Sequence, residues 1–206
     1  MANIKLIGVA QSRAVRNLWM LEELGLPYEH EKIATSDPCL KAPPYSTLNP
    51  NGRIPTLVVD GFAVWESLAI NLYLAQKFAS DVSPRGLEES AQATQWSCWA
   101  MSDVDPLITQ WAMNTLIKPE AERDPALAAQ ALAGLARPIA ALEAALTGRR
   151  WLLGDRFTVA DLNVAAVLNR ALAWELADAP NLKAWLARCW ARPAAIAARR
   201  LRGDKV

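Results

Sequence analysis

The sequence predicts an α/β domain followed by an all-helical domain, and three observations support this division. Short β-prone runs occur within the first 80 positions and are missing beyond them. A small polar segment rich in turn-forming residues comes next. After that segment, apolar residues recur at the three- and four-residue steps typical of helices. We therefore expect domains at residues 1–80 and 87–206, joined by a linker at 81–86.

The α/β domain is predicted to begin with a strand at residues 4–8 and a helix at 13–24. Gly25 and Pro27 stop that helix, because glycine accepts the left-handed cap and proline cannot continue the helical hydrogen bonding. Residues 28–33 form a second strand, which is too polar for the centre of a sheet and should lie at an edge.

The second half of this domain contains a predicted β-hairpin. Residues 38–48 are proline-rich and should hold one irregular helix before it. The β-prone runs 57–59 and 62–65 are joined by Asp60-Gly61, a strongly favoured two-residue turn. The hairpin then delivers the chain into a helix predicted at 67–79.

The two ends of the hairpin suit the binding of a small extended peptide. Proline is tolerated at the first residue of a strand, and a bond before proline is the usual place for a cis peptide. A cis Ile54-Pro55 bond would turn the main-chain groups of Ile54 sideways, where an extended peptide can pair with them. Beside Glu66, Ser67 opens a helix and offers its hydroxyl and free N–H groups to an anion. An ordinary loop proline and a plain N-cap serine are the alternative interpretations.

The second domain is predicted to be a helical bundle. Its first helix is long, covers residues 87–116 and should be kinked by Pro106. Asp124-Pro125 combines an N-cap with a proline at the first helical position, and it opens an alanine-rich helix. Residues 181–190 and a last segment from Pro193 complete the bundle.

A capping motif marks the start of another helix in this domain. Thr158 and Asp161 form a variant of the capping box, and Phe157 and Leu162 flank it as a hydrophobic staple. We expect this motif to fix the helix start and to make no contact with substrate.

Composition and charge exclude several classes of partner. The formal net charge of +1 provides no basic stripe for nucleic acid. Cys39, Cys98 and Cys189 are far apart and His30 is the one histidine, which argues against a disulfide framework, a dithiol motif and a bound metal. We recognise no signal peptide and no apolar run that approaches a membrane span, so we expect a cytoplasmic protein with no membrane partner.

Three runs of the sequence resemble the cytosolic glutathione transferases. The most specific run is N-P-N-G-R-I-P-T-L-V-V-D-G-F-A-V-W-E-S-L-A-I-N-L-Y-L-A, supported by K-L-I-G-V-A-Q-S-R-A-V-R-N-L-W-M-L-E-E-L-G-L-P-Y-E and by F-T-V-A-D-L-N-V-A. The resemblance implies a thioredoxin-like first domain with a mixed four-stranded sheet, glutathione as co-substrate and a role in detoxification. It also implies a homodimer in which the long helix of the second domain meets its partner.

The resemblance assigns glutathione-binding roles to residues on both sides of the hairpin. Glu66 and Ser67 would hold the amino and carboxylate groups of the γ-glutamyl unit. The Ile54 main chain would pair with the cysteinyl unit. Lys41 and Arg53 are the candidates for the glycyl carboxylate.

Ser12 is the candidate that stabilises the thiolate. A free thiol has a pKa of about 8.5, and lowering it by roughly two units requires about 2.7 kcal/mol. A hydroxyl hydrogen bond to a charged acceptor supplies about 1.5 to 3 kcal/mol, and a helix N-terminus adds roughly 0.3 to 2. The spacing of Ser12 to Arg16 resembles the serine-type theta and phi classes, whereas tyrosine-type members would need a tyrosine near Ile7 and Gly8 and the bacterial cysteine type a cysteine at Gln11. A serine that only caps the helix is the alternative.

The acceptor pocket is expected between the two domains, and it should suit a hydrophobic electrophile. Its candidate residues come from the first loop and from one face of the long helix: Val9, Ala10, Trp96, Trp99, Asp103 and Trp111. Aromatic stripes on helices commonly pack in a core instead, so packing is the alternative role for the tryptophans.

The leading functional hypothesis is therefore a glutathione transferase that joins the glutathione thiolate to an electrophile. A glutathione-dependent disulfide reductase or peroxidase is a second hypothesis, based on Gln11 and Arg13 beside the sulfur site. A non-catalytic protein that binds apolar ligands is a third, based on the tryptophan-rich helix.

Overall fold

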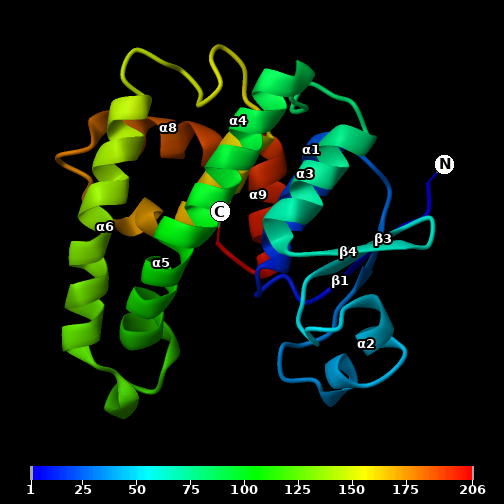
Figure 1. Cartoon of the computed structure of the whole chain (residues 1–206). Helices are drawn as coiled ribbons and strands as arrows, with labels where there is room; N and C mark the ends of the chain where they lie inside the picture. The colour runs from blue at the N-terminus through cyan, green and yellow to red at the C-terminus, as the bar shows by residue number, and fades with distance from the viewer. Residues whose placement is uncertain (1, 206) are drawn as a thin grey trace. The chain divides into compact units, whose positions relative to one another are not determined.

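The computed structural model describes residues 2–205 and divides them into two compact units (Figure 1). The first unit consists of the chain up to Pro84 together with the segment that begins at Ala191, and the second is Arg85–Trp190. The last helix, which we expected in the helical bundle, thus groups with the α/β unit.

A mixed four-stranded sheet forms the centre of the first unit, as predicted. Its strands are β1 (Ile4–Ile7), β2 (Glu29–Glu31), β3 (Thr56–Val59) and β4 (Phe62–Trp65), in the order β2-β1-β3-β4. β1 pairs with β2 in parallel, and the β3–β4 hairpin continues the sheet antiparallel to β1. The polar strand β2 lies at the edge, where Lys5 of β1 pairs with Glu29 at 2.9 Å.

Helix α1 (Ala14–Leu24) is the packing centre of the helical layer in this unit. Its first eight residues are all buried, and it contacts both α3 (Ser67–Lys77) and α9 (Pro193–Arg202). It ends at Gly25 with a φ of 61°, the left-handed cap that the sequence predicts. Arg192, just before α9, donates to both carboxylate oxygens of Glu23 at 2.7 Å. This ion pair and the packing of α9 against α1 account for the place of the last helix in the first unit.

The proline-rich segment forms two short helices instead of the one irregular helix expected. These are η1 (Pro38–Lys41) and α2 (Tyr45–Leu48). Pro43 and Pro44 separate them, because a proline cannot donate a helical hydrogen bond. Leu40 and Tyr45 are buried with Ile7 of the sheet in a small apolar cluster.

The second unit begins with a long, irregular helical run. It consists of α4 (Gly86–Trp99), the π-helical η2 (Ala100–Val104), α5 (Asp105–Ala112), the π-helical η3 (Met113–Ile117) and the short η4 (Glu120–Glu122). The N–H of Asp105 donates to Ala100, five residues back. Pro106 follows and has no N–H, so the helix changes its hydrogen-bond pattern at this point. The irregularity that the sequence predicts at Pro106 is therefore a π-helical turn just before it.

Two of the remaining helices of the second unit begin at caps predicted from the sequence. The remaining helices are α6 (Pro125–Ala145), α7 (Val159–Val167), η5 (Leu168–Ala173) and α8 (Pro180–Trp190). The Asp124 carboxylate accepts from the N–H groups of Ala126 and Leu127, so the predicted N-cap is confirmed. The capping box of Thr158 and Asp161 is also present at the start of α7, whose residues are all buried.

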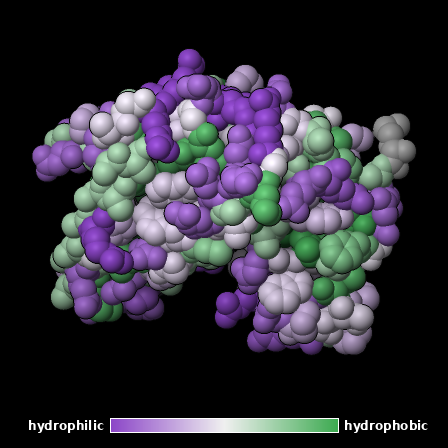
Figure 2. Space-filling model, turned by 45° about the horizontal axis from the view of Figure 1, so that its top comes forward, coloured by the Kyte–Doolittle hydropathy of each residue, from purple (hydrophilic) through white to green (hydrophobic). Residues whose placement is uncertain are grey.

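Helix α6 corrects the expectation that no apolar run approaches a membrane span. It has 21 residues, and the mean hydropathy of its most apolar 18-residue window is 1.2. Among residues 2–205 it is the one helix that is long and apolar enough to cross a membrane. Its many alanines count as apolar, and 28% of that window is buried. Figure 2 shows pale green, mildly hydrophobic atoms interspersed with purple on the left, the side where α6 lies in Figure 1. Helices of soluble proteins pass the same test, so the finding is weak evidence for a membrane.

Candidate functional site

Ser12 lies in the turn between β1 and α1, at the helix start where the sequence places it. Its hydroxyl donates to the Val9 carbonyl at 2.7 Å and accepts from the Ala14 N–H at 3.1 Å. The Ser12 hydroxyl therefore accepts a hydrogen bond from one of the first N–H groups of α1, which have no partner within the helix. A thiolate bound here would compete with the Val9 carbonyl for the hydroxyl proton.

The loop that carries Ser12 touches the segment before β3 through a glycine. Gly8 has a φ of 132°, and a Cβ at this position would lie 2.9 Å from the Cβ of Ile54. Only glycine permits this close approach. The Ile54-Pro55 bond is cis, as predicted. Within residues 2–205, the N–H and C=O of Ile54 have no hydrogen-bond partner, so both are available to an added extended peptide.

The two candidates for the glycyl carboxylate are also neighbours. A Cβ at Gly52 would lie 2.9 Å from the Leu40 carbonyl oxygen and 3.4 Å from Cγ of Lys41. The turn before Arg53 therefore rests against helix η1, which ends at Lys41. Both cationic side chains are exposed.

Glu66 and Ser67 meet at a strained junction between β4 and α3. Glu66 has φ 72° and ψ 114°, a conformation that non-glycine residues rarely adopt and that costs about 1 to 3 kcal/mol. Its side chain is exposed, whereas Ser67 is buried. Arg16 of α1 donates to the Ser67 hydroxyl at 3.3 Å, and Asn17 donates to the Ser67 carbonyl at 2.7 Å. Strain of this kind concentrates at binding sites, where the surrounding structure holds it in place.

Helix α1 connects the two serines of the candidate site. Ser12 precedes its first turn, and Arg16, one turn later, reaches Ser67 at the start of α3. Arg16 is buried, so its charge lies in a medium of low dielectric, where it favours an anion more than an exposed charge does. The helix N-termini of α1 and α3 add partial positive charge on the same unit.

Sequence reasoning missed several polar residues that support this site. Tyr45, Asn49 and Thr56 form a buried hydrogen-bond network under Arg53. Asn71 of α3 accepts from Asn17 at 2.8 Å. Asn49 stands in the quoted N-P-N-G-R-I-P run. However, the residues around these side chains in the sequence do not distinguish a buried, supporting side chain from an exposed one.

The candidate acceptor residues lie in different units, so the pocket stays a prediction. Val9 is half-buried and Ala10 is buried in the first unit. In the second unit, Trp96 and Trp99 pack edge to face with ring centroids 5.1 Å apart. Trp111 packs in the same way against Trp174 at 4.9 Å.

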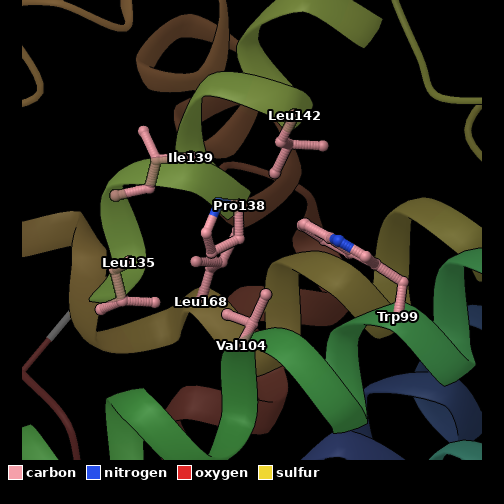
Figure 3. Close-up of a pocket in the computed structure, with 7 residues that line it drawn as sticks. All are labelled: Trp99, Val104, Leu135, Pro138, Ile139, Leu142 and Leu168. Carbon is pink, nitrogen blue, oxygen red and sulfur yellow. The ribbon is translucent and has the colours of Figure 1, made fainter. Parts of the chain in front are cut away.

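Two of these residues have defined contacts with α6. Asp103 accepts from Arg137 of α6 at 2.8 Å. Trp99 borders a shallow apolar crevice of the second unit. Figure 3 shows the side chains that line it: Trp99, Val104, Leu135, Pro138, Ile139, Leu142 and Leu168. Trp99 is half-buried, and its role in an acceptor pocket stays a prediction.

Among residues 2–205, no three His, Cys, Asp or Glu side chains gather in a way that could hold a metal ion. The candidate site contains hydroxyls, main-chain groups, positive charges and the carboxylate of Glu66.

Two protein-family models match the chain, one on each side of the linker. The model described as "Glutathione S-transferase, N-terminal domain" matches residues 12–77. The model described as "Glutathione S-transferase, C-terminal domain" matches residues 104–193. The first match includes Ser12 and every candidate glutathione-binding residue.

Curated relatives cover nearly the whole chain. Glutathione S-transferase 3 of Zea mays is 32% identical over 207 residues, which are 94% of this chain and 92% of the relative. Glutathione S-transferase GstB of Escherichia coli K12 is 31% identical over 187 residues, which are 86% of this chain and 88% of the relative.

Solved structures give the same result. The theta class glutathione S-transferase of Xanthomonas axonopodis pv. citri, solved with glutathione bound, has a TM-score of 0.86 and 33% identity, covering 100% of this chain and 99% of its own. The glutathione transferase URE2P5 of Phanerochaete chrysosporium has a TM-score of 0.89 and 26% identity, covering 98% and 96%.

Proposed function

The chain belongs to the glutathione S-transferase family, with the thioredoxin-like first domain and helical second domain of that family, and on this premise we propose that it transfers the glutathione thiolate to a hydrophobic electrophile. Glutathione is the co-substrate, and the structural relative from Xanthomonas axonopodis binds it. The proposal gives the protein a role in detoxification.

The tripeptide is held along the first unit by groups that match its charges. Glu66 and Ser67 receive the amino and carboxylate groups of the γ-glutamyl unit, with buried Arg16 behind Ser67. The unpaired main chain of Ile54 pairs with the cysteinyl unit as an added strand. The exposed cations of Lys41 and Arg53 attract the glycyl carboxylate.

Ser12 and the N-terminus of α1 stabilise the thiolate. The Ser12 hydroxyl exchanges its hydrogen bond to the Val9 carbonyl for one to the sulfur, and its oxygen continues to accept from the Ala14 N–H. A hydrogen bond to a charged acceptor contributes about 1.5 to 3 kcal/mol and the helix terminus roughly 0.3 to 2. Together they supply the roughly 2.7 kcal/mol needed to lower the pKa of the thiol by about two units. The thiol proton passes to solvent, and the thiolate attacks the electrophilic carbon. A carbon–sulfur bond forms while the bond to the leaving group breaks, and that group, chloride in chlorodinitrobenzene, departs with the bonding electron pair.

The close approach of Gly8 and Ile54 is the observation that carries this proposal. It brings the two free main-chain groups of Ile54 to the loop that bears Ser12. A cysteinyl unit paired with Ile54 would therefore present its sulfur near that loop. Helix α1 begins at the same loop, and its Arg16 donates to Ser67, the residue that receives the γ-glutamyl end.

Calorimetric titration with glutathione tests the binding step. Heat of binding is the expected result, and no heat would end the proposal. A panel of assays with glutathione then tests the reaction: conjugation of chlorodinitrobenzene, reduction of a peroxide and reduction of a mixed disulfide. We expect conjugation. Turnover of the disulfide or the peroxide alone would replace a transferase with a reductase or a peroxidase, and binding without any turnover would favour a binding protein.

A homodimer in the cytoplasm is part of the same proposal. Membership of the family supports the dimer, with the long helix of the second unit at the interface. Light scattering coupled to size exclusion measures the mass directly. A mass near that of one 22.5 kDa chain would contradict the dimer.

A further inference from the structure

A buried network of hydrogen bonds holds the main chain just before Ile54. The Tyr45 hydroxyl of α2 lies 2.5 Å from the Arg53 carbonyl oxygen and 2.7 Å from Oγ1 of Thr56. The side-chain amide of Asn49 lies 2.8 Å from the same carbonyl oxygen and 3.1 Å from the same hydroxyl. Tyr45, Asn49 and Thr56 are all buried.

The number of available protons fixes the direction of each bond. A tyrosine hydroxyl has one proton, and the Arg53 carbonyl can only accept, so Tyr45 donates to Arg53. The hydroxyl of Thr56 must then donate to Tyr45. The amide of Asn49 has two protons, one for Arg53 and one for Thr56. The Arg53 carbonyl thus receives two donors, and every donor in the network is used.

The peptide unit between Arg53 and Ile54 transmits this restraint to the candidate site. In a planar trans peptide, the C=O and the N–H point in opposite directions. Buried donors hold the Arg53 carbonyl on the protein side, so the Ile54 N–H is directed away from them. That N–H has no partner within residues 2–205.

We propose that Tyr45 is a positioning residue of the glutathione site. Its hydroxyl, together with Asn49, fixes the Arg53–Ile54 peptide so that the Ile54 N–H faces the cysteinyl carbonyl of the bound tripeptide. The inference rests on the proposed function, because it assumes that glutathione pairs with Ile54. It adds a buried phenol that sets binding without touching the ligand.

The hydroxyl is separable from the packing role of the ring. The Tyr45 ring belongs to the apolar cluster with Ile7 and Leu40, which a phenylalanine ring would preserve. Tyr45→Phe therefore deletes one of the two donors to the Arg53 carbonyl. We expect the Kd for glutathione, measured by calorimetry, to rise about three- to tenfold, the effect of losing one hydrogen bond. The Kd for S-hexylglutathione should rise by the same factor, because the affected contact is to the main chain and not to the sulfur.

Two further readouts separate positioning from general damage. The pKa of the bound thiol should stay at the parent value in Tyr45→Phe, since the sulfur is not the group affected. Tyr28→Phe is the matched control, because it deletes a hydroxyl that donates to Glu22 at 2.8 Å elsewhere in the unit. Thr56→Val disturbs the same network but removes neither donor to Arg53, so it should lower the denaturant midpoint and raise the Kd less than twofold.

The outcomes distinguish this inference from the proposed function. A parent protein that fails to bind glutathione would overturn both. A parent that binds, with Tyr45→Phe indistinguishable from Tyr28→Phe, would overturn the role of Tyr45 alone. Should Tyr45→Phe fail to fold, hydrogen exchange of the Ile54 amide in the parent tests the contact on which the inference depends. Saturating glutathione should slow that exchange at least tenfold, and an unchanged rate would overturn the inference.

Discussion

The side-chain amide of Gln11 donates to the main-chain carbonyl of Arg202 at 2.9 Å, joining residues 191 positions apart. The contact links the loop that carries Ser12 to the end of α9, where Gly203 adopts a left-handed cap with a φ of 94°. The reductase hypothesis places Gln11 beside the sulfur. In the structure its amide holds the C-terminal segment against the loop that carries Ser12.

Removing this contact should loosen the loop more than it destabilises the fold. In Gln11→Ala we expect kcat/KM for conjugation to fall about two- to fivefold, since the loop loses one restraint next to Ser12. The bond is exposed, so the free energy of unfolding should fall by less than about 1 kcal/mol. Gln76→Ala, at an exposed position of α3, is the control for deleting a surface amide. Equal kinetics in the two variants would show that the contact has no effect on catalysis.

Acid should release the end of α9 through Asp204. Hydrogen bonds from Arg202, and then from Arg199, hold the pKa of the Asp204 carboxyl below its usual range. A lowered pKa in the folded state stabilises the protein above the ordinary pKa, and this contribution is lost as the pH falls through the folded value. The difference in unfolding free energy between the parent and Asp204→Asn should therefore shrink below about pH 4. A difference that stays constant down to pH 2 would contradict this assignment.

Ser12→Ala tests the thiolate mechanism. The variant should bind glutathione with nearly parental affinity, because the peptide contacts remain. The pKa of the bound thiol should rise toward the free value of about 8.5, with kcat near neutral pH at least tenfold lower. Ultraviolet titration of the bound thiolate measures the pKa directly. Unchanged ionisation would leave Ser12 with only its contact to the Ala14 N–H.

The positive φ of Glu66 predicts that two substitutions which both weaken binding differ in their effect on stability. Glu66→Ala and Glu66→Gly both lose the carboxylate, so both should bind glutathione more weakly. Glycine accepts a φ of 72° without a steric penalty, whereas alanine does not. Urea unfolding should therefore show Glu66→Gly to be more stable than Glu66→Ala by about 1 kcal/mol. The reverse order would mean that the position stores no strain.

Asp161 should be the most sensitive polar residue of the second unit. Its carboxylate accepts from the N–H groups of Leu152 at 2.8 Å and Thr158 at 3.0 Å, and from the indole of Trp185 at 2.9 Å. The Thr158 hydroxyl donates to the same carboxylate at 3.2 Å. Asp161→Ala leaves these four buried donors without their acceptor, which should cost at least about 3 kcal/mol of unfolding free energy. Denaturant unfolding measures the loss, with exposed Asp155→Ala as the control. A loss below about 1 kcal/mol would mean that solvent replaces the carboxylate.

Elements governed by neighbouring residues were predictable from the sequence. Asp60-Gly61 sets the hairpin, Gly25 ends α1, and Asp124 caps α6, each through a conformation or hydrogen bond within a few positions. Local chemistry also placed Ser12 and Ser67 at helix starts. It did not predict the break between η1 and α2 at Pro43 and Pro44, because that break depends on how Leu40 and Tyr45 pack against Ile7 of the sheet.

The sequence by itself thus determined the succession of strands, turns and helix caps, and with them the positions of the candidate binding residues. Only the tertiary structure decided which residues contact and support one another. Arg16 meets Ser67 across 51 positions, Arg192 meets Glu23 across 169, and Tyr45 meets the carbonyl of Arg53 through a change in chain direction. Contacts of this kind depend on how distant segments pack around a shared core, and no local period of apolar residues encodes that packing.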